Sequence, residues 1–112
     1  MELTTRRIDD VMIIDFNGSL DTSTSGDVQD ELIKFVEDGE TKIILNLKNL
    51  EYVSSAGLRV ILILSKLLQS HQGELRLCSA NKIVDEVLKT SGFNSLLQVL
   101  DNEANAIASV VS

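Results

Sequence analysis

The hydrophobic and polar residues of this chain follow two different periods in turn. Short apolar runs rich in β-branched residues alternate with longer segments in which apolar residues recur every three or four positions, which is the difference between strands and amphipathic helices. On this pattern we predict strands over residues 2–8, 11–17, 42–47, 74–78 and 96–100. We predict helices over residues 24–38, 55–70, 81–90 and 102–111.

The order of these segments predicts the fold class. Strands that alternate with helices indicate a partly parallel sheet with right-handed crossovers, and the Asp9-Asp10 pair between the first two strands indicates a tight hairpin. The segment 11–16 is apolar almost throughout, so we expect an interior strand that ends at Gly18. The chain has no proline, and it shows no repeat or low-complexity stretch. We therefore expect one α/β domain over residues 1–112.

The helix predicted over residues 55–70 has two contrasting faces. At about 100° per residue, its core face comprises Val60, Ile61, Leu64, Leu67 and Leu68. Gly57 falls near the centre of that face, where a glycine costs roughly 0.5–1 kcal/mol against alanine. We expect the missing side chain to permit a close approach to the sheet. The opposite face comprises Ser55, Arg59, Leu62, Lys66 and Gln69.

Leu62 is the unusual member of that outer face. The pattern predicts that it points at water between Arg59 and Lys66. An apolar side chain ringed by cations is typical of a small interaction site, but single exposed leucines are also common in proteins without such a site. The sequence leaves both interpretations open.

Two serines begin the same helix, and they too have two interpretations. Ser54 or Ser55 is a favoured N-cap, whose side-chain oxygen accepts a hydrogen bond from a free backbone N–H. The same helix end carries unpaired N–H groups and a partial positive charge, so it also tolerates a phosphate. Phosphorylation of Ser55 would place roughly −1.5 to −2 charges on the outer face without unfolding the helix, with Arg59 one turn along as a further donor.

Composition narrows the class of protein. The chain carries a net charge of −7 and its ten Lys and Arg residues are mostly scattered, so direct binding to nucleic acid or to an anionic membrane surface is disfavoured. The longest uninterrupted apolar run, residues 60–64, is far shorter than a membrane span, and the N-terminus lacks the apolar core of a signal peptide. Cys78 is the only cysteine, which fits a reducing compartment. We expect a cytoplasmic protein without membrane insertion, and self-association stays open.

Catalysis is disfavoured by what the sequence lacks. His71 is the single histidine, and it lies at the far end of the predicted helix from Ser55, about 24 Å away at about 1.5 Å per residue. That distance excludes a Ser-His-Asp triad built on these two residues. One cysteine and one histidine do not make a zinc site, and no phosphate-binding glycine-rich loop is present. We expect no catalytic residue, no metal and no cofactor.

Two segments carry a family resemblance. Residues 47–58, Leu-Lys-Asn-Leu-Glu-Tyr-Val-Ser-Ser-Ala-Gly-Leu, closely resemble the signature of anti-anti-sigma factors in the STAS family, and residues 18–21, Gly-Ser-Leu-Asp, resemble that family's Gly-x-Leu-Asp segment. The resemblance implies a mixed β-sheet of four to five strands with about four helices packed largely on one side. It also implies a partner that is both an anti-sigma factor and a serine kinase. Binding makes that partner release its sigma factor, phosphorylation breaks the complex, and a phosphatase restores it.

The same resemblance implies roles for particular residues. The phosphorylated serine of the family aligns with Ser55, and a loop residue beside the same site aligns with Asp21. The family's aspartate before the serine is Ser54 here, which makes Ser54 a rival acceptor. The partner-binding residues predicted in this way and from the outer face are Asp21, Ser54, Ser55, Arg59, Leu62 and Lys66. The alternative is a non-catalytic STAS adaptor subunit of a transporter or sensory signalling complex, which would use the same helix face.

Overall fold

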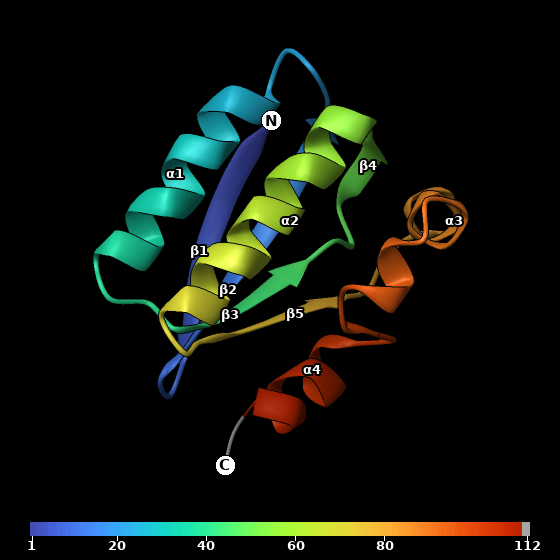
Figure 1. The fold of residues 1–112 in the computed structure, drawn as a ribbon. Coiled ribbons are helices and arrows are strands. Elements are labelled where there is room, and N and C mark those ends of the chain that lie inside the picture. The colour runs from blue at the N-terminus through green and yellow to red at the C-terminus, as the bar shows by residue number, and fades with distance from the viewer. Residues whose placement is uncertain (111–112) are drawn as a thin grey trace.

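Figure 1 shows the fold in a computed structural model that describes residues 1–110. Within these residues, strands and helices alternate after an opening hairpin. The strands are β1 (Glu2–Ile8), β2 (Val11–Leu20), β3 (Lys42–Asn46), β4 (Leu50–Val53), β5 (Glu74–Cys78) and β6 (Val99–Leu100). The helices are α1 (Ser25–Glu37), α2 (Ser55–Ser70), α3 (Lys82–Thr90) and α4 (Glu103–Val110), with a 3₁₀ segment η1 (Phe93–Ser95).

The strands form one mixed sheet in the order β1-β2-β3-β5-β6, and β4 pairs with the end of β2 off this path. β1 and β2 are antiparallel and the other pairs are parallel, as a hairpin followed by helical crossovers requires. In the turn between β1 and β2, Asp9 has φ 55°, the left-handed conformation that tight hairpins use. These pairings confirm the predicted hairpin and the interior position of the second strand.

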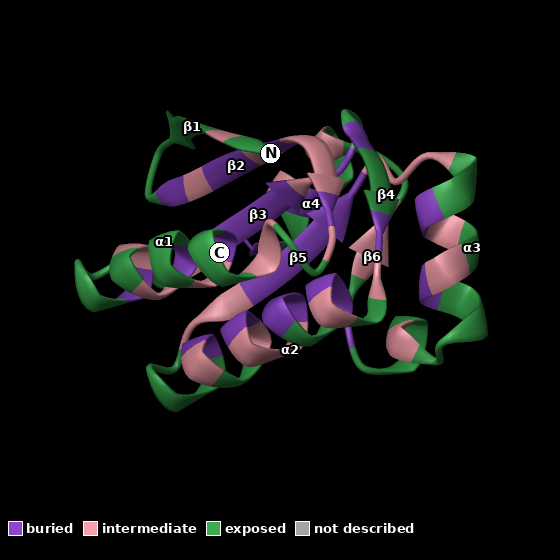
Figure 2. Ribbon diagram, turned by 90° about the horizontal axis from the view of Figure 1, so that it is seen from above, coloured by how far each residue is buried: buried purple, intermediate pink, exposed green. Residues whose placement is uncertain are grey.

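The helices cover the two faces of the sheet unequally. A large core cluster joins side chains of α1, α2 and α3 to one face, and it includes Ile14 of β2. Ile13 points to the other face, because successive strand side chains alternate, and it packs with Ala106 and Val110 of α4 in a smaller cluster. Figure 2 shows that the buried residues follow β2, β3 and β5. Helices therefore lie largely on one side, as expected.

Hydrogen-bonded ion pairs attach α4 to the far face of the sheet. Arg6 donates to Asp15 at 2.7 and 2.8 Å and to Glu103 at 3.1 and 2.5 Å. Asn46 also donates to Glu103, at 2.9 Å. The hydrogen bond from Arg6 lowers the pKa of the Glu103 carboxyl. Since these groups satisfy one another, we assign them to positioning α4.

The sheet differs from the prediction at β2 and β4. We predicted that the second strand ends at Gly18, but β2 continues to Leu20 because Gly18 takes φ 112° and the pairing register shifts between Gly18 and Ser19. The extension pairs with β4, a strand that the sequence pattern did not predict. The described part of the sheet therefore has six strands, where four to five were expected.

The remaining differences concern the ends of elements. The last predicted strand, 96–100, is reduced to β6, because Leu96 and Leu97 donate their backbone N–H groups back to Phe93 and continue the turn of η1. Every helix end that the structure describes falls within one residue of its prediction. Val111, at the end of the predicted helix 102–111, lies outside the described residues. Among residues 1–110, no helix is long and apolar enough to cross a bilayer.

Candidate functional site

The ends of β2 and β4 bring the two motif segments together. Leu20 and Val53, the last residues of the two strands, are paired in the parallel ladder. The Ser54 N–H then donates to the Leu20 carbonyl at 2.9 Å, so α2 begins directly beside the loop that leaves β2. That loop contains Asp21, as the resemblance implied. Leu20 and Val53 are 33 residues apart in sequence and adjacent in the fold.

Gly57 allows the first turn of α2 to lie against this junction. A Cβ atom at position 57 would lie 2.6 Å from the Leu20 carbonyl oxygen, 2.8 Å from the Leu20 Cγ and 2.9 Å from a methyl group of Val53. The first of these neighbours is backbone, which cannot swing aside. The close approach predicted from the position of Gly57 on the core face is confirmed, and it fixes where Ser54 and Ser55 lie.

The two serines at the start of α2 have different roles. Ser54 is the N-cap: its backbone is extended, with φ −92° and ψ 176°, and its Oγ accepts a hydrogen bond from the Gly57 N–H at 3.3 Å. Ser55 is the first helical residue and is exposed. Within the described part of the chain, the Ser55 hydroxyl makes no hydrogen bond. Of the two serines that the sequence offered as the N-cap, Ser54 is the one that caps the helix, and Ser55 is left without a hydrogen-bond partner in the described residues.

Asp21 organises the neighbouring loop. Its Oδ1 accepts hydrogen bonds from the Ser23 N–H at 2.9 Å, the Ser23 hydroxyl at 2.8 Å and the Thr24 N–H at 3.2 Å. The Ser23 hydroxyl, and then the backbone N–H groups, hold the pKa of the Asp21 carboxyl below its ordinary value. Thr24 is the N-cap of α1, but its side chain does not cap; its hydroxyl donates instead to the Ser19 carbonyl at 2.9 Å. Asp21 is therefore an ionised, fixed group at the edge of the site.

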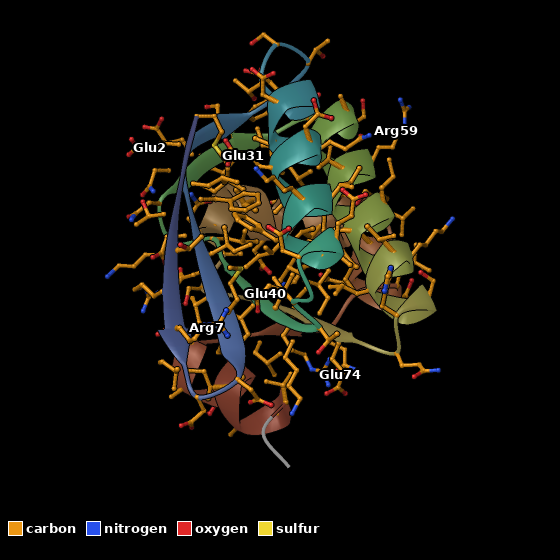
Figure 3. All side chains as sticks on the ribbon, turned by 90° about the vertical axis from the view of Figure 1, so that its left-hand side faces the viewer. Glu2, Arg7, Glu31, Glu40, Arg59 and Glu74 are labelled. Atoms are coloured by element: carbon orange, nitrogen blue, oxygen red, sulfur yellow. The ribbon has the colours of Figure 1, made fainter. Side chains whose placement is uncertain are left out.

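The outer face of α2 carries two cations that extend into solvent. Arg59 and Lys66 are both exposed, and neither forms an ion pair with any residue from 1 to 110. Figure 3 shows Arg59 pointing away from the body of the molecule. Leu62 is half-buried, so the prediction that it points at water is wrong. At about 100° per residue it lies on the flank of the strip between the two cations, not on its outermost line.

Tyr52 is an exposed residue of this region that the sequence reasoning missed. It lies on β4, pairs with Ser19, and has 48% of its surface exposed. An exposed aromatic side chain beside Ser54 adds an apolar contact to a site that is otherwise polar. The sequence signal for this strand is the segment Leu50-Glu51-Tyr52-Val53, in which apolar residues stand at both ends. The structure buries those two end residues and exposes Glu51 and Tyr52 between them.

The geometry gives no support to catalysis or metal binding at this place. His71 is the C-cap of α2, and Ser55 is at the opposite end of the 16-residue helix. Among residues 1–110, no three His, Cys, Asp or Glu side chains lie close enough together to hold a metal ion. What the arrangement offers is a free hydroxyl at the positive end of a helix, a fixed carboxylate beside it and two cations along the same face.

Comparison with known proteins identifies the family. The STAS domain model matches residues 2–106. A Bordetella bronchiseptica protein named as the anti-sigma factor antagonist BtrV is 39% identical over 108 residues, covering 96% of this chain and 93% of that protein. An anti-sigma F factor antagonist of Paenibacillus polymyxa is 36% identical over 98 residues, covering 87% of this chain and 84% of that protein. This chain belongs to the STAS domain family, and both relatives carry the name that the motifs indicated.

A solved structure agrees with the fold over the same length. The crystal structure of a Thermotoga maritima protein named as an anti-sigma factor antagonist has a TM-score of 0.92 at 27% identity, covering 96% of this chain and 93% of that chain. The mixed α/β fold with helices largely on one face is therefore shared with relatives of the same name, which confirms the fold class implied by the motifs.

Proposed function

We propose that this chain is an anti-sigma factor antagonist that binds an anti-sigma factor with serine kinase activity, makes it release a sigma factor, and is switched off when the kinase phosphorylates Ser55. The observation that carries the proposal is the Ser55 hydroxyl, which is exposed at the first position of α2 and uncommitted within the described residues. Family membership supports the class of partner, and the helix geometry supports the acceptor.

In the proposed step, the Ser55 Oγ attacks the γ-phosphorus of ATP held by the kinase. An Oγ–P bond forms, the bond from the γ-phosphorus to the β-bridging oxygen breaks, ADP leaves, and the hydroxyl proton passes to a base of the kinase. The product carries roughly −1.5 to −2 charges. The N–H groups of Ser55 and Ala56 at the start of α2 have no hydrogen-bond partner in the described residues, and Arg59 lies one turn along, so the domain itself accommodates the phosphate.

The local contacts favour Ser55 over its rival Ser54. The Ser54 hydroxyl already accepts from the Gly57 N–H, and Ser54 is partly buried. A phosphate on Ser54 would have to replace that capping contact beside the tight junction with Leu20. A phosphate on Ser55 replaces nothing. It adds charge to an exposed face on which a partner fitted to a neutral hydroxyl meets an unmatched anion.

The proposal also includes the cellular location and the reversal of the switch. We propose that the chain acts as one STAS domain over residues 1–112, in the cytoplasm together with its kinase. A phosphatase removes the phosphate and restores the form that binds the partner. Asp21, Arg59 and Lys66 contribute to the contact surface around Ser55.

Incubation with candidate anti-sigma factor kinases and ATP, followed by mass-spectrometric mapping of the phosphate, tests the proposal. Wild type and Ser54→Ala are expected to take up one phosphate at Ser55, and Ser55→Ala none. Ser54→Ala is the matched control, because it removes a neighbouring hydroxyl and leaves the acceptor. A phosphate that maps to Ser54, or that persists in Ser55→Ala, would contradict the assignment.

A further inference from the structure

The outer faces of helices α1 and α2 carry charges of opposite sign. Adding 29 to an α1 residue number places buried Val28 on buried Gly57 of α2 and buried Leu32 on buried Ile61, although exposed Glu31 falls on buried Val60. On the outer faces, all exposed, the residues that correspond are Asp30 with Arg59 and Glu37 with Lys66. Each helix thus carries two like charges seven residues apart, which is two helical turns on one side. We call Asp30 and Glu37 the acidic strip, and Arg59 and Lys66 the basic strip.

The two strips lie next to each other on the surface. α1 and α2 pack against one another and run in the same direction, as Figure 1 shows. Each helix follows a strand whose last residue, Leu20 or Val53, is paired with the other, so the helices begin at the same edge of the sheet. All four residues of the two strips are exposed, and among residues 1–110 none of their side chains forms an ion pair.

The separation of charge between the helices is strong. α2 contains no acidic residue in its 16 positions, although the chain has 17 acidic residues and a net charge of −7. α1 and its C-cap carry three further acidic residues against one cation, Lys34. Elsewhere in the described residues, five cations are paired with carboxylates: Arg6, Arg7, Lys42, Arg76 and Lys89. The basic strip is therefore made of two cations without an ion pair in the described residues, a property shared by Lys34, Lys48 and Lys82, and its Arg59 lies one turn from Ser55.

We propose that the anti-sigma factor recognises this face by complementary strips, with carboxylates over Arg59 and Lys66 and cations over Asp30 and Glu37. This inference rests on the proposed function and adds the chemistry of the partner's surface. A uniformly acidic or uniformly basic partner meets one attractive and one repulsive strip, so the order of the strips gives specificity and register. The half-buried Leu62, on the flank of the basic strip, supplies apolar contact area beside the partner's carboxylates.

The same arrangement gives phosphorylation two effects in one place. Ser55 lies four residues before Arg59 on the outer face, so a phosphate on Ser55 is a neighbour of the Arg59 guanidinium. The phosphate takes up the cation that a partner carboxylate requires, and it places an anion opposite that carboxylate. Phosphorylation of Ser55 thus changes the charge at the N-terminal end of the basic strip, around Arg59, from positive to negative.

A strip-exchange experiment tests the proposal on the full chain, with the kinase that phosphorylates Ser55 as the probe. Affinity for the kinase is measured for three proteins. They are wild type, the α2 variant with Arg59→Glu and Lys66→Glu, and a variant with four substitutions, called the four-fold variant, that adds Asp30→Lys and Glu37→Lys to the α2 variant. The four-fold variant exchanges the signs of the two strips and keeps the net charge of wild type. We expect both variants to lose at least about tenfold in affinity at low salt, because like charges then face each other. We expect the loss to shrink at about 0.5 M salt, where screening is stronger.

A matched control separates strip position from total charge. Lys48→Glu with Lys82→Glu makes the same change in net charge as the two α2 substitutions, at exposed positions outside both strips. We expect this control to bind within about threefold of wild type, since it leaves the strips intact. Either of two results would show that the partner does not recognise the strips. The first is a four-fold variant that binds as tightly as wild type, and the second is a control that loses as much affinity as the α2 variant.

The outcomes also separate this inference from the proposed function. If no anti-sigma factor kinase binds wild type, the proposed function fails, and the inference fails with it. If wild type binds and the α2 variant binds equally well, only the inference fails. Light scattering covers the second-copy alternative, since exchanged strips stay self-complementary. A wild-type dimer that persists in the four-fold variant and dissociates in the α2 variant would assign the face to self-association and overturn the inference.

Discussion

The starts of α1 and α2 lie side by side and are used in opposite ways. At α1, the Asp21 carboxylate accepts hydrogen bonds from the N–H groups of Ser23 and Thr24, just before the first helical residue, and Asp27 places a second acid in the first turn. At α2, the first turn contains no acid, and the cap is the neutral hydroxyl of Ser54. The chain thus provides its own anion at one helix start and none at the other.

This difference is the reason that we place the proposed acceptor at α2 and not at α1. A helix start that already has carboxylates close to it has its partial positive charge largely offset. The start of α2 keeps its partial positive charge and presents the uncommitted Ser55 hydroxyl beside it. Its position is fixed by Gly57 against Leu20, so the site is rigid before any partner arrives.

The largest expected effect comes from removing the close approach at α2. Gly57→Ala places a Cβ 2.6 Å from the Leu20 carbonyl oxygen, and we expect a loss of about 1–3 kcal/mol in the free energy of unfolding. The matched control at α1 is Gly26→Ala, where a Cβ has no neighbour within 4 Å and the higher helix propensity of alanine applies. Urea denaturation measures both. A Gly57→Ala variant as stable as Gly26→Ala would mean that the junction does not fix the site.

The second effect separates the two serines of α2. Ser54→Ala removes the capping hydrogen bond to Gly57, and we expect it to lower the free energy of unfolding by about 1 kcal/mol. Ser55→Ala removes an exposed hydroxyl without a partner, and we expect a change within about 0.5 kcal/mol. Both are read from the same denaturation curves. Equal losses in the two variants would show that Ser55 is also engaged in the fold.

A smaller effect of opposite sign is expected when α2 receives the anion that α1 already has. Ser55→Asp places a carboxylate at the positive end of the helix, and we expect the free energy of unfolding to rise by about 0.3–1 kcal/mol. Calorimetry at low salt measures it, and added salt is expected to reduce the gain. Destabilisation by Ser55→Asp would argue against a helix start that tolerates charge.

The smallest effect is expected at α1, from the pH dependence of Asp21. Hydrogen bonds from Ser23 and Thr24 lower the Asp21 pKa, so the carboxylate stabilises the fold above its ordinary pKa of about 3.9. That contribution is lost as the pH falls through the lower pKa of the folded state. Wild type is therefore expected to exceed Asp21→Asn in stability at pH 7, with the difference vanishing as the pH falls through the lowered pKa of the folded state. A difference independent of pH would mean that the ionised form is not the one being held.

Most of the fold could be predicted because its elements carry local signals. Short stretches of sequence predict each of three elements: the apolar period predicts α2, the Asp9-Asp10 pair predicts the hairpin turn, and the β-branched pair Ile43-Ile44 predicts β3. β4 could not be predicted in this way. It has only four residues, and it is stabilised by pairing with the part of β2 that begins at Gly18. A glycine at that position usually predicts the end of a strand, so the extension of β2 was not expected.

The site could be predicted in part. The motif and the helical period place Ser54, Ser55 and Arg59 at the start and on the outer face of α2, and the structure agrees. Which serine is the cap depends on the backbone angles of a single residue, and sequence patterns do not resolve a helix boundary to that accuracy. The exposure of Tyr52 depends on β4 and was missed for the same reason as the strand itself.

The most direct test compares the Ser55-phosphorylated chain with the unmodified chain in two measurements on the same sample, the melting temperature and the affinity for the kinase partner. We expect a melting temperature that is unchanged or slightly raised, with an affinity lower by about a hundredfold or more. A phosphate that lowers the melting temperature by several degrees, or that leaves the affinity within about threefold, would contradict the claim that α2 begins with an anion site built to receive the modification and to lose the partner.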